Sequence, residues 1–304
     1  MNLSIDAFAM PLAALAAVLL DRVLGEPRRW HPLVGFGNLA SMLEKKLNNR
    51  HISSGLLAWL LVVGPWVALA FWLRPFAPFA VDVALLYFAL GAQSLAEHAE
   101  AVARPLREGR LDEARTRVSW MVSRETSQLD ESGVAKAGVE SVLENGNDAI
   151  FGTLFWFALL GGPGALLFRL ANTLDAMWGY RTERYNLFGR FAARFDDLLN
   201  WLPARLTALT YALLGRTRNA LACWKTQAPG WESPNAGPVM SAGAGSLGVL
   251  LGGAAMYHGQ EEIRPPLGTG PAPLAADLGR AITLIQRSLW LWLAVFFMIG
   301  ILHA

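Results

Sequence analysis

Four long apolar runs constrain this chain more than any other feature of its 304 residues. A helix needs about 20 apolar residues to cross the hydrocarbon core of a bilayer. Charged residues make up only 16% of the chain, against about 25% in soluble domains. We therefore expect an all-α fold, a polytopic bundle of membrane helices. The runs with few or no charges are residues 3–20, 55–73, 81–95 and 289–302.

Two further apolar runs contain helix-breaking residues. Residues 149–168 are interrupted by Gly161-Gly162-Pro163-Gly164, which should end one helix and start another. Residues 237–256 are so rich in Gly, Ala and Ser that they indicate a tightly packed buried helix or a broken one. We expect a single integral membrane domain, residues 1–304. Its parts are N-terminal spans (1–95), polar helices around the broken segment (96–235), and a Gly-rich helix with a C-terminal span (236–304).

Basic residues in the connections predict the orientation in the membrane. The connection between the first two spans carries six cations, whereas the next connection carries only Arg74. By the positive-inside rule, the first connection is cytoplasmic. We expect a multi-pass protein of the inner, cytoplasmic membrane whose site faces the cytoplasm. The six cations are Arg22, Arg28, Arg29, Lys45, Lys46 and Arg50.

Two amphipathic, Arg-rich segments, residues 96–148 and 169–205, flank the broken run. A single crossing between them would place them on opposite faces of the membrane. A helical hairpin, or re-entrant pair, keeps both Arg115 and Arg190 cytoplasmic, and it is allowed where its backbone is buried in protein. We therefore favour a fold in which the two Arg-rich segments form amphipathic cytoplasmic helices. The run between them would form a Gly/Pro-broken or re-entrant helix pair rather than a single crossing.

Charge and cysteine content argue against several functional classes. A net charge of +2 without a dense basic stripe does not favour a nucleic-acid partner. The single cysteine, Cys223, offers neither an intramolecular disulfide nor a zinc cluster. The first ten residues carry Asp6 and no cation, so we expect the first apolar run to be retained rather than cleaved as a signal peptide.

A row of carboxylates precedes the broken run. Ser127-Gln128-Leu129-Asp130 has the form of a capping box and predicts that a helix starts there. Glu140, Glu144 and Asp148 recur every four residues, and they would share one face of that helix if it extends as far as Asp148. Asp148 adjoins the apolar Ile150, so it would lie at membrane depth, where a carboxylate needs a partner. A divalent cation is the natural partner, and a solvated acidic face is the alternative.

A second polar group follows the break. Asn172 and Asp175, three residues apart, could share a cation or a metal-bound phosphate. Arg181 supplies a planar fork for phosphate or carboxylate, with Tyr185 close behind it.

Two later segments could belong to the functional site or could have only a structural role. Asp196, Asp197 and Asn200 with Arg205 fit helix capping and a structural Asp–Arg pair equally well. The turn of residues 233–237 could cradle a phosphate or be a plain junction between loop and helix. Neither a Walker loop nor a dinucleotide-binding loop stands there.

An ordered series of motifs covers nearly the whole chain and resembles the CobD/CbiB-type adenosylcobinamide-phosphate synthases. Ser123 replaces a glycine of that pattern, Trp231-Glu232 stands where a histidine is common, and Leu267-Gly268-Thr269-Gly270 replaces a Gly-Asp type of turn. The matching motifs are Asp21-Arg22-Val23-Leu24-Gly25-Glu26-Pro27-Arg28 with His31-Pro32, Arg124-Glu125-Thr126-Ser127-Gln128-Leu129-Asp130-Glu131, Val139-Glu140-Ser141-Val142 with Glu144-Asn145, Asn172-Thr173-Leu174-Asp175 with Gly179-Tyr180-Arg181, Phe188-Gly189, Asp196-Asp197, Pro203-Ala204-Arg205 and Ser233-Pro234-Asn235-Ala236-Gly237.

The resemblance implies ATP-dependent amide formation between adenosylcobyric acid and aminopropanol phosphate, or a related amino-alcohol phosphate. Activation would give an acyl phosphate or an acyl adenylate, with ATP and Mg²⁺ as co-substrate and metal. Candidate partners are these substrates, the lipid bilayer and other membrane enzymes of corrinoid assembly. From side-chain chemistry we assign the metal to Asp148 and Asp175, with Glu144 as second choice. Glu140 completes the predicted catalytic group as base for the incoming ammonium. The predicted substrate-binding residues are Arg124, Ser127, Asp130, Asn145, Asn172, Arg181, Tyr185 and Asn235.

Two other classes remain open. A membrane protein of the beta-lactamase-regulation type would act as an accessory or signalling component. A transporter would also place carboxylates and a broken helix within the membrane. ATP turnover separates the enzyme from both.

Overall fold

The computed structural model describes residues 5–27, 31–257 and 259–304, which are mostly helical. Four helical segments in this part of the chain are long and apolar enough to cross a membrane, so the protein has the make-up of a multi-pass membrane protein. Residues 3 and 4 of the first predicted span, and the basic Arg28 and Arg29, lie outside the described residues. The four segments are Ala7–Leu24, Ile52–Phe76, Pro78–Arg107 and Ala275–His303.

The described chain forms two compact units, each made of separate stretches of sequence. Unit 1 comprises residues 1–91, 148–200 and 293–304, and unit 2 comprises residues 92–147 and 201–292. Helices α10 (Arg190–Leu214) and α13 (Ala275–His303) each contribute residues to both units. Each unit draws residues from all three consecutive parts expected from the sequence.

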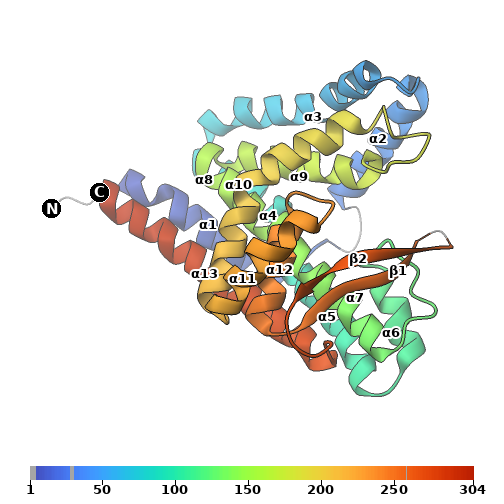
Figure 1. The fold of residues 1–304 in the computed structure, drawn as a ribbon. Coiled ribbons are helices and arrows are strands. Elements are labelled where there is room, and N and C mark those ends of the chain that lie inside the picture. Colours follow the sequence, from blue (N-terminus) through green and yellow to red (C-terminus); the bar gives the residue numbers. More distant parts are fainter. Residues whose placement is uncertain (1–4, 28–30, 258) are drawn as a thin grey trace. The chain divides into compact units, whose positions relative to one another are not determined.

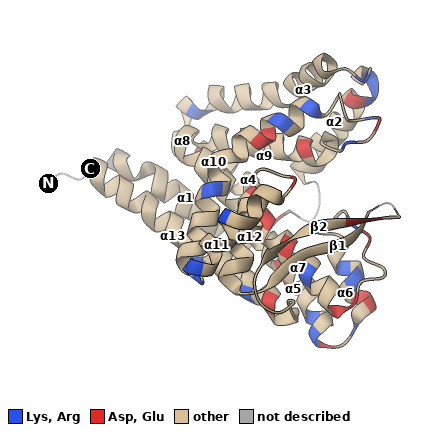
Figure 2. Ribbon diagram, viewed as in Figure 1, with Lys and Arg blue, Asp and Glu red and all other residues tan. Residues whose placement is uncertain are grey.

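Unit 1 contains helices joined by loops, with no strand among its described residues, and is built around aromatic side chains. Trp178 and Phe188 meet edge to face with ring centroids 5.0 Å apart, and Trp59 and Phe168 are buried in the same core. Figure 2 shows that α3 carries no charge along its length, as the second predicted span requires. Besides parts of α10 and α13, the elements of unit 1 are α1 (Ile5–Leu24), α2 (Pro32–Leu47), α3 (Ile52–Leu73), the 3₁₀ turn η1 (Arg74–Phe76), α4 (Pro78–Ala89), α8 (Gly152–Leu160) and α9 (Gly162–Trp178), as drawn in Figure 1.

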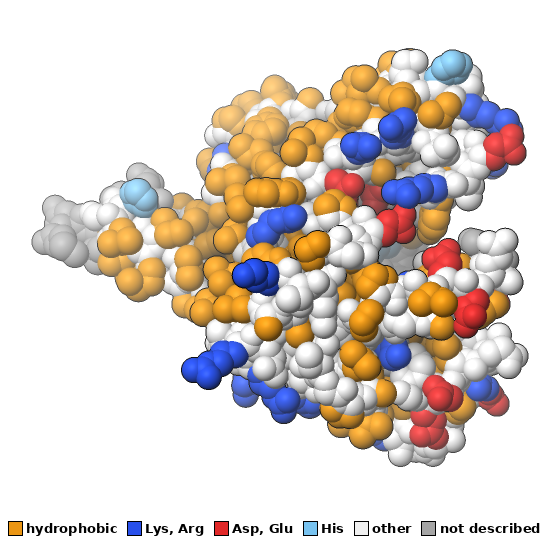
Figure 3. All heavy atoms as spheres, in the orientation of Figure 1, with side chains coloured by type: hydrophobic (Ala, Val, Ile, Leu, Met, Phe, Trp, Pro, Cys, Tyr) orange, Lys and Arg blue, Asp and Glu red, His pale blue; other side chains and the backbone are white. Residues whose placement is uncertain are grey.

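Large hydrophobic side chains cover the outside of the apolar helices. In Figure 3 they gather over α1, α3 and the end of α13. Soluble proteins rarely expose contiguous apolar patches of this kind, because each apolar surface kept in water costs free energy. These faces therefore fit contact with lipid. Among the exposed side chains are Leu19, Val23, Leu57, Leu60, Trp66, Phe71, Trp72, Met298, Ile299 and Leu302.

Helices α8 and α9 form the Gly/Pro-broken pair that the sequence predicts. A Cβ at Gly164 would lie 2.3 Å from the carbonyl oxygen of Trp156, and one at Gly152 would lie 2.2 Å from the ring of Phe168. From the first contact to the second, the position moves backward along α8, from Trp156 to Gly152, and forward along α9, from Gly164 to Phe168, so the two helices run antiparallel and touch closely. The helix pair is confirmed, and its placement relative to the membrane faces stays a prediction.

The break itself is held by a charged side chain of α4. Gly161 has a φ of +70°, and a Cβ there would lie 2.6 Å from the Arg74 guanidinium, so only glycine fits. The buried Asp82 carboxylate accepts the Gly162 backbone N–H at 2.8 Å and pairs with Arg74 at 2.9 Å. Asp82 thus accepts a hydrogen bond from an N–H at the start of α9 that has no partner within the helix, and the Arg74 guanidinium compensates the negative charge of Asp82.

Unit 2 contains a second set of helices and the two strands in the described chain. The predicted capping box is displaced, because α7 begins at Glu131 and Asp130 is its N-cap, accepting the Gly133 N–H at 2.6 Å. Ser127 therefore lies before the helix rather than at its start. Besides parts of α10 and α13, the elements of unit 2 are α5 (Ala92–Arg107), α6 (Leu111–Val118), α7 (Glu131–Gly146), α11 (Thr217–Gln227), the 3₁₀ turn η3 (Ala228–Gly230), α12 (Ala236–Leu247), β1 (Leu250–Tyr257) and β2 (Gln260–Gly268).

The expectation of an all-α fold is wrong at the Gly-rich run, which contains a helix and then a strand. Helix α12 ends at Leu247 because Gly248 adopts a left-handed conformation, with φ +71°. Strand β1 then pairs antiparallel with β2. The register shifts opposite Pro265-Pro266, where an irregular ladder tolerates residues that lack an N–H. The pattern of small residues suited both structures, so periodicity could not separate them.

The carboxylate row is also interrupted. Helix α7 ends at Gly146, and a π-helical segment, η2 (Asn147–Phe151), follows it. A π segment changes the angular spacing of side chains, so Asp148 does not simply continue the α-helical face of Glu140 and Glu144. Those two residues belong to unit 2, and Asp148 belongs to unit 1. The prediction of one uninterrupted acidic face is therefore wrong.

The close approach of α8 and α9 can be tested with one methyl group. Gly164→Ala should lower the free energy of unfolding by about 1–3 kcal/mol, because its Cβ would press on the Trp156 backbone. The matched control is Gly64→Ala in α3, where no atom of another described element lies within 4 Å of the added Cβ. Thermal unfolding in detergent measures both. Equal midpoints for the two variants would contradict the packed hairpin.

Candidate functional site

Three aspartates of unit 1, Asp148, Asp175 and Asp196, form what we call the acidic cluster. Burial is the main cause that raises the pKa of Asp175 to about 6, and the negative charges of Asp148 and Asp197 contribute to the same rise. Burial likewise raises the pKa of Asp196 well above its usual range, with Asp148 and Asp175 adding to the effect. The carboxylates are therefore close enough to repel one another. A cation bound among them would relieve that repulsion.

Amide side chains hold the buried member of the acidic cluster. Asn200 donates to Asp196 at 3.0 Å, and Asn172 donates to its other oxygen at 3.5 Å. The predicted substrate-binding residue Asn172 thus lies beside the predicted metal ligand Asp175, in one cluster. Asp196 also belongs to the acidic cluster. From the sequence it could have had either a structural or a functional role.

A buried cation borders the acidic cluster. The charges of Glu26 and Asp148 both act on Arg169, whose pKa is lowered by burial. Within the described residues, the Arg169 Nε–H is buried without a hydrogen-bond partner. Arg169 was not among the residues that the sequence patterns singled out, although Glu26 belongs to the N-terminal motif. Only the fold places that motif near Asp148.

Arg181 and Tyr185 follow α9. The charges of Arg194 and Arg181 oppose the burial that raises the pKa of Asp197, so Arg181 lies near that carboxylate. Tyr185 is partly buried against the core of unit 1, and the Arg184 guanidinium lies 5.5 Å from its ring centroid. These contacts suit a packing role for Tyr185 as well as the predicted binding role.

The donors of the acidic cluster fit a metal that arrives with its substrate. No three His, Cys, Asp or Glu side chains in the described part of the chain meet as a metal-binding group. Mg²⁺ is held by one or two carboxylates together with phosphate oxygens and water. Asp148 and Asp175 match that need, whereas the second choice, Glu144, lies on α7 of unit 2.

In unit 2, Glu140 is held by four donors. The buried Arg124 pairs with one carboxylate oxygen, and Arg264 bridges both oxygens at 3.0 and 3.3 Å. The backbone N–H of Gly252 donates to Glu140 at 2.7 Å. A carboxylate with its lone pairs engaged in this way is a poor proton acceptor, so the geometry does not favour the predicted role as base. Arg264, on β2, is a residue that the sequence did not single out.

Of three other predicted binding residues of unit 2, two make local contacts and one lies at the surface. The Asn145 amide donates to the Ser141 carbonyl at 2.9 Å, on its own helix. Asp130 caps α7, and Ser127 is exposed in the loop before it. The structure gives Asp130 and Asn145 structural contacts and leaves Ser127 at the surface.

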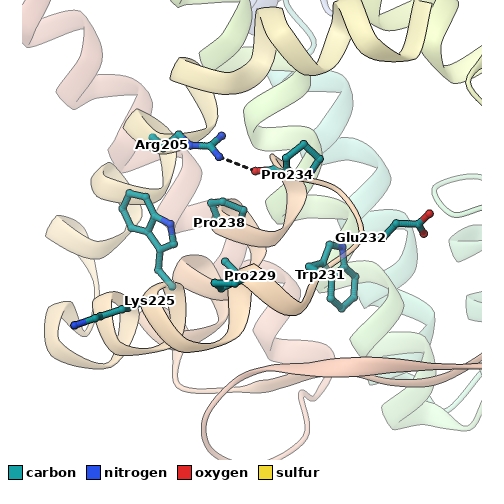
Figure 4. A pocket seen from close by; sticks show the side chains of 9 residues that line it. Arg205, Lys225, Pro229, Trp231, Glu232, Pro234 and Pro238 are labelled. Carbon is teal, nitrogen blue, oxygen red and sulfur yellow. Dashed lines mark hydrogen bonds between the residues drawn. The ribbon is translucent and has the colours of Figure 1, made fainter. Parts of the chain in front are cut away.

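An open pocket of about 450 Å³ lies beside the predicted binding residue Asn235. Arg205 lies at its edge and donates to the Pro234 carbonyl at 2.9 Å (Figure 4). It also donates to the Asn235 side-chain oxygen at 2.7 Å. The Ser233 hydroxyl accepts the Asn235 and Ala236 N–H groups, which are therefore engaged within the turn. This favours a junction between loop and helix over a phosphate cradle. The pocket is lined by Arg205, Trp224, Lys225, Ala228, Pro229, Trp231, Glu232, Pro234 and Pro238.

Fold and site together define a helical, multi-pass membrane protein with charged clusters buried between its helices. The sequence pattern described as CobD/Cbib protein matches residues 14–285. The chain belongs to this CobD/CbiB family, as the motifs of the sequence predict.

Curated relatives match almost end to end. A cobalamin biosynthesis protein CobD of Chromobacterium violaceum is 58% identical, over 95% of this chain and 97% of the relative. One of Stutzerimonas stutzeri is 56% identical, over 96% and 99%. The cobalamin biosynthesis protein CbiB of Salmonella choleraesuis is 36% identical, over 94% and 96%. No solved structure matches this chain.

The raised pKa of Asp175 predicts a pH-dependent stability. The folded state binds this proton more tightly than the unfolded chain, so its contribution is present at low pH and is lost as the pH rises through about 6. Between pH 4 and 7.5, metal-free protein should lose up to about 3 kcal/mol of unfolding free energy through this group. In Asp175→Asn, the unfolding free energy should fall less over this pH range, because the group that causes this part of the loss is absent. Denaturant unfolding in detergent with EDTA measures it, and parallel pH profiles for both proteins would contradict the prediction.

Proposed function

We propose that this protein acts in cobalamin biosynthesis as an ATP-dependent ligase. It would join adenosylcobyric acid to aminopropanol phosphate, or a related amino-alcohol phosphate, through an amide bond. Near-complete alignment with curated cobalamin biosynthesis proteins supports the pathway. The acidic cluster is the observation that supports nucleotide chemistry within it.

A carboxylate does not condense with an amine in water unaided, so the proposed reaction first activates the substrate carboxylate with ATP. The substrate carboxylate attacks the γ-phosphorus of ATP, and ADP leaves, so that an acyl phosphate forms. The amine of the amino-alcohol phosphate then attacks the acyl carbon, inorganic phosphate leaves, and the ammonium proton passes to solvent or to a base. Asp148 and Asp175 would hold Mg²⁺, which neutralises charge on the triphosphate when bound.

The chain's own side chains would bind and orient the reactants. Arg181, with its planar fork, is a candidate for phosphate oxygens, and Asn172 for orienting an oxygen near the acidic cluster. We assign Glu140 to positioning Arg124 and Arg264, since its oxygens already accept four hydrogen bonds. The site would face the cytoplasm, where ATP is available.

Isotope transfer tests the ligase and its intermediate together. Purified protein is incubated with Mg²⁺, ATP, aminopropanol phosphate and adenosylcobyric acid carrying ¹⁸O in its carboxylate. We expect the amide product and one ¹⁸O atom in inorganic phosphate, both detected by mass spectrometry. Asp148→Asn should slow both on the order of 100-fold, because an amide cannot replace the anionic ligand.

The control for that variant is Asp112→Asn, at a side chain that is 95% exposed on α6. It should leave both signals unchanged. Label in AMP would replace the acyl phosphate with an acyl adenylate. Amide without any ¹⁸O transfer would remove both intermediates, and absence of amide would remove the ligase in favour of a transporter or an accessory protein.

Membrane topology is a separate prediction. If α8 and α9 form a re-entrant pair, residues 112 and 190 lie on the cytoplasmic side. Asp112→Cys and Arg190→Cys are made in a Cys223→Ser background, since Cys223 is the only native cysteine. Neither site should react with an impermeant maleimide added to intact cells, and both should react in inverted membrane vesicles. Labelling of position 190 from outside, without labelling of position 112, would show a full crossing.

A further inference from the structure

Three cationic side chains of unit 2 gather at the base of the β-hairpin. Arg124 and Arg264 both pair with Glu140. Lys136, one turn earlier on α7, places its Nζ 3.8 Å from the point where a side chain of Gly253 would begin. The hairpin thus brings a cation of α7, one of the preceding loop and one of β2 to the same place.

The charges of this group do not balance. Glu140 is the only carboxylate of the described residues that pairs with Arg124 or Arg264, so these three side chains together with Lys136 carry a net charge of +2. Arg124, Glu140 and Arg264 are 6%, 3% and 14% exposed in their side chains, so water screens them little. Among the described residues, Glu261 and Glu262 on β2 are exposed and form no ion pair with the group. The buried part, Arg124, Arg264 and Glu140, has one positive charge in excess, and the half-buried Lys136 adds a second. Excess charge away from water is costly unless an ion of opposite sign binds.

Hydrogen-bonding capacity is also left over. A guanidinium has five N–H donors and an ammonium has three. Within the described residues, Arg124 donates only to Glu140, and Lys136 makes no hydrogen bond or ion pair. The donors that remain can serve a ligand.

The backbone leaves room for that ligand. Gly253 has a φ of +82°, and among the described residues other than its chain neighbours Lys136 Nζ is the only heavy atom within 4 Å of the place where its Cβ would stand. Gly252, by contrast, is pressed against the Pro265 carbonyl and gives its N–H to Glu140. Gly252 therefore packs the hairpin closely against its surroundings, whereas Gly253 leaves open space beside the ammonium group of Lys136.

We infer that Arg124, Lys136 and Arg264 form a binding site for a phosphate monoester, with Glu140 as the residue that positions the two arginines. A phosphate monoester carries close to two negative charges at neutral pH, which matches the excess. Planar guanidinium forks and a mobile ammonium are the groups that recognise such an anion. The site lies at the hairpin that the sequence did not predict.

Two sources of this phosphate are compatible with the proposed reaction. The amino-alcohol phosphate carries a phosphate monoester, and ATP carries a terminal phosphate of similar shape. We assign the site to the amino-alcohol phosphate, because the excess of two charges suits a lone monoester better than a triphosphate. This assignment of the source rests on the proposed function, whereas the anion site does not.

Calorimetric titration of the full chain in detergent tests the site without turnover. Aminopropanol phosphate and Mg²⁺-free ATP are titrated separately into the native protein and its variants. Lys136→Gln should raise the dissociation constant for aminopropanol phosphate about tenfold, the effect of one charged hydrogen bond. Lys136→Arg, which keeps the charge, should change it by less than about threefold. Neither should alter the melting temperature, since Lys136 has no partner to lose among the described residues.

The matched control is Lys46→Gln, an exposed lysine on α2, which should bind like the native protein. Weaker binding of ATP alone in Lys136→Gln would keep the anion site and reassign its source. Equal binding of both ligands by Lys136→Gln and the native protein would overturn the site, as would no binding of either by the native protein. Failure of the ligase leaves these binding results standing, so the two proposals can fail separately.

Discussion

The ion pair between Arg74 and Asp82 is the interaction on which unit 1 depends. A carboxylate within an apolar helix is costly, and here its charge is matched by a guanidinium and by the N–H at the start of α9. That contact fixes the turn at Gly161. The turn in turn sets the antiparallel register of α8 and α9. Because Gly152 faces Phe168 in this register, Asp148 one turn earlier is brought toward Asn172 and Asp175 one to two turns later.

The two units solve the problem of buried charge in opposite ways. In unit 1 the acidic cluster carries excess negative charge, which raises the pKa values of Asp175 and Asp196. In unit 2 one carboxylate serves two arginines with a lysine nearby, so the excess is positive. The first arrangement suits a cation, and the second suits an anion. The proposed ligase, which would use Mg²⁺, ATP and a phosphorylated amine, would need both kinds of site.

Sequence reasoning succeeded where the signal was local. Gly161-Gly162-Pro163-Gly164 predicted the helix pair, because glycine and proline act on the backbone directly. It misplaced the start of α7, where Ser127 and Asp130 both have the chemistry of a cap and the structure uses Asp130. The residues of β1 were predicted to be helical, because a run of Gly and Ala shows no hydrophobic periodicity that would distinguish a helix from a strand. Contacts between Glu140 and Arg264, which lie 124 residues apart, had no signal in a single sequence.

The three carboxylates of the predicted row show why spacing could not assign their roles. Spacing of four residues was the same for Glu140, Glu144 and Asp148, yet their surroundings differ. Glu140 is saturated by donors from β1, β2 and the loop before α7, and Asp148 acts on the pKa values of aspartates from α9 and α10. A carboxylate that is fully hydrogen-bonded holds other groups in place, whereas one that faces other carboxylates is ready for a cation. Partners distant in sequence, rather than position along one helix, therefore divide the row into a positioning residue and a candidate metal ligand.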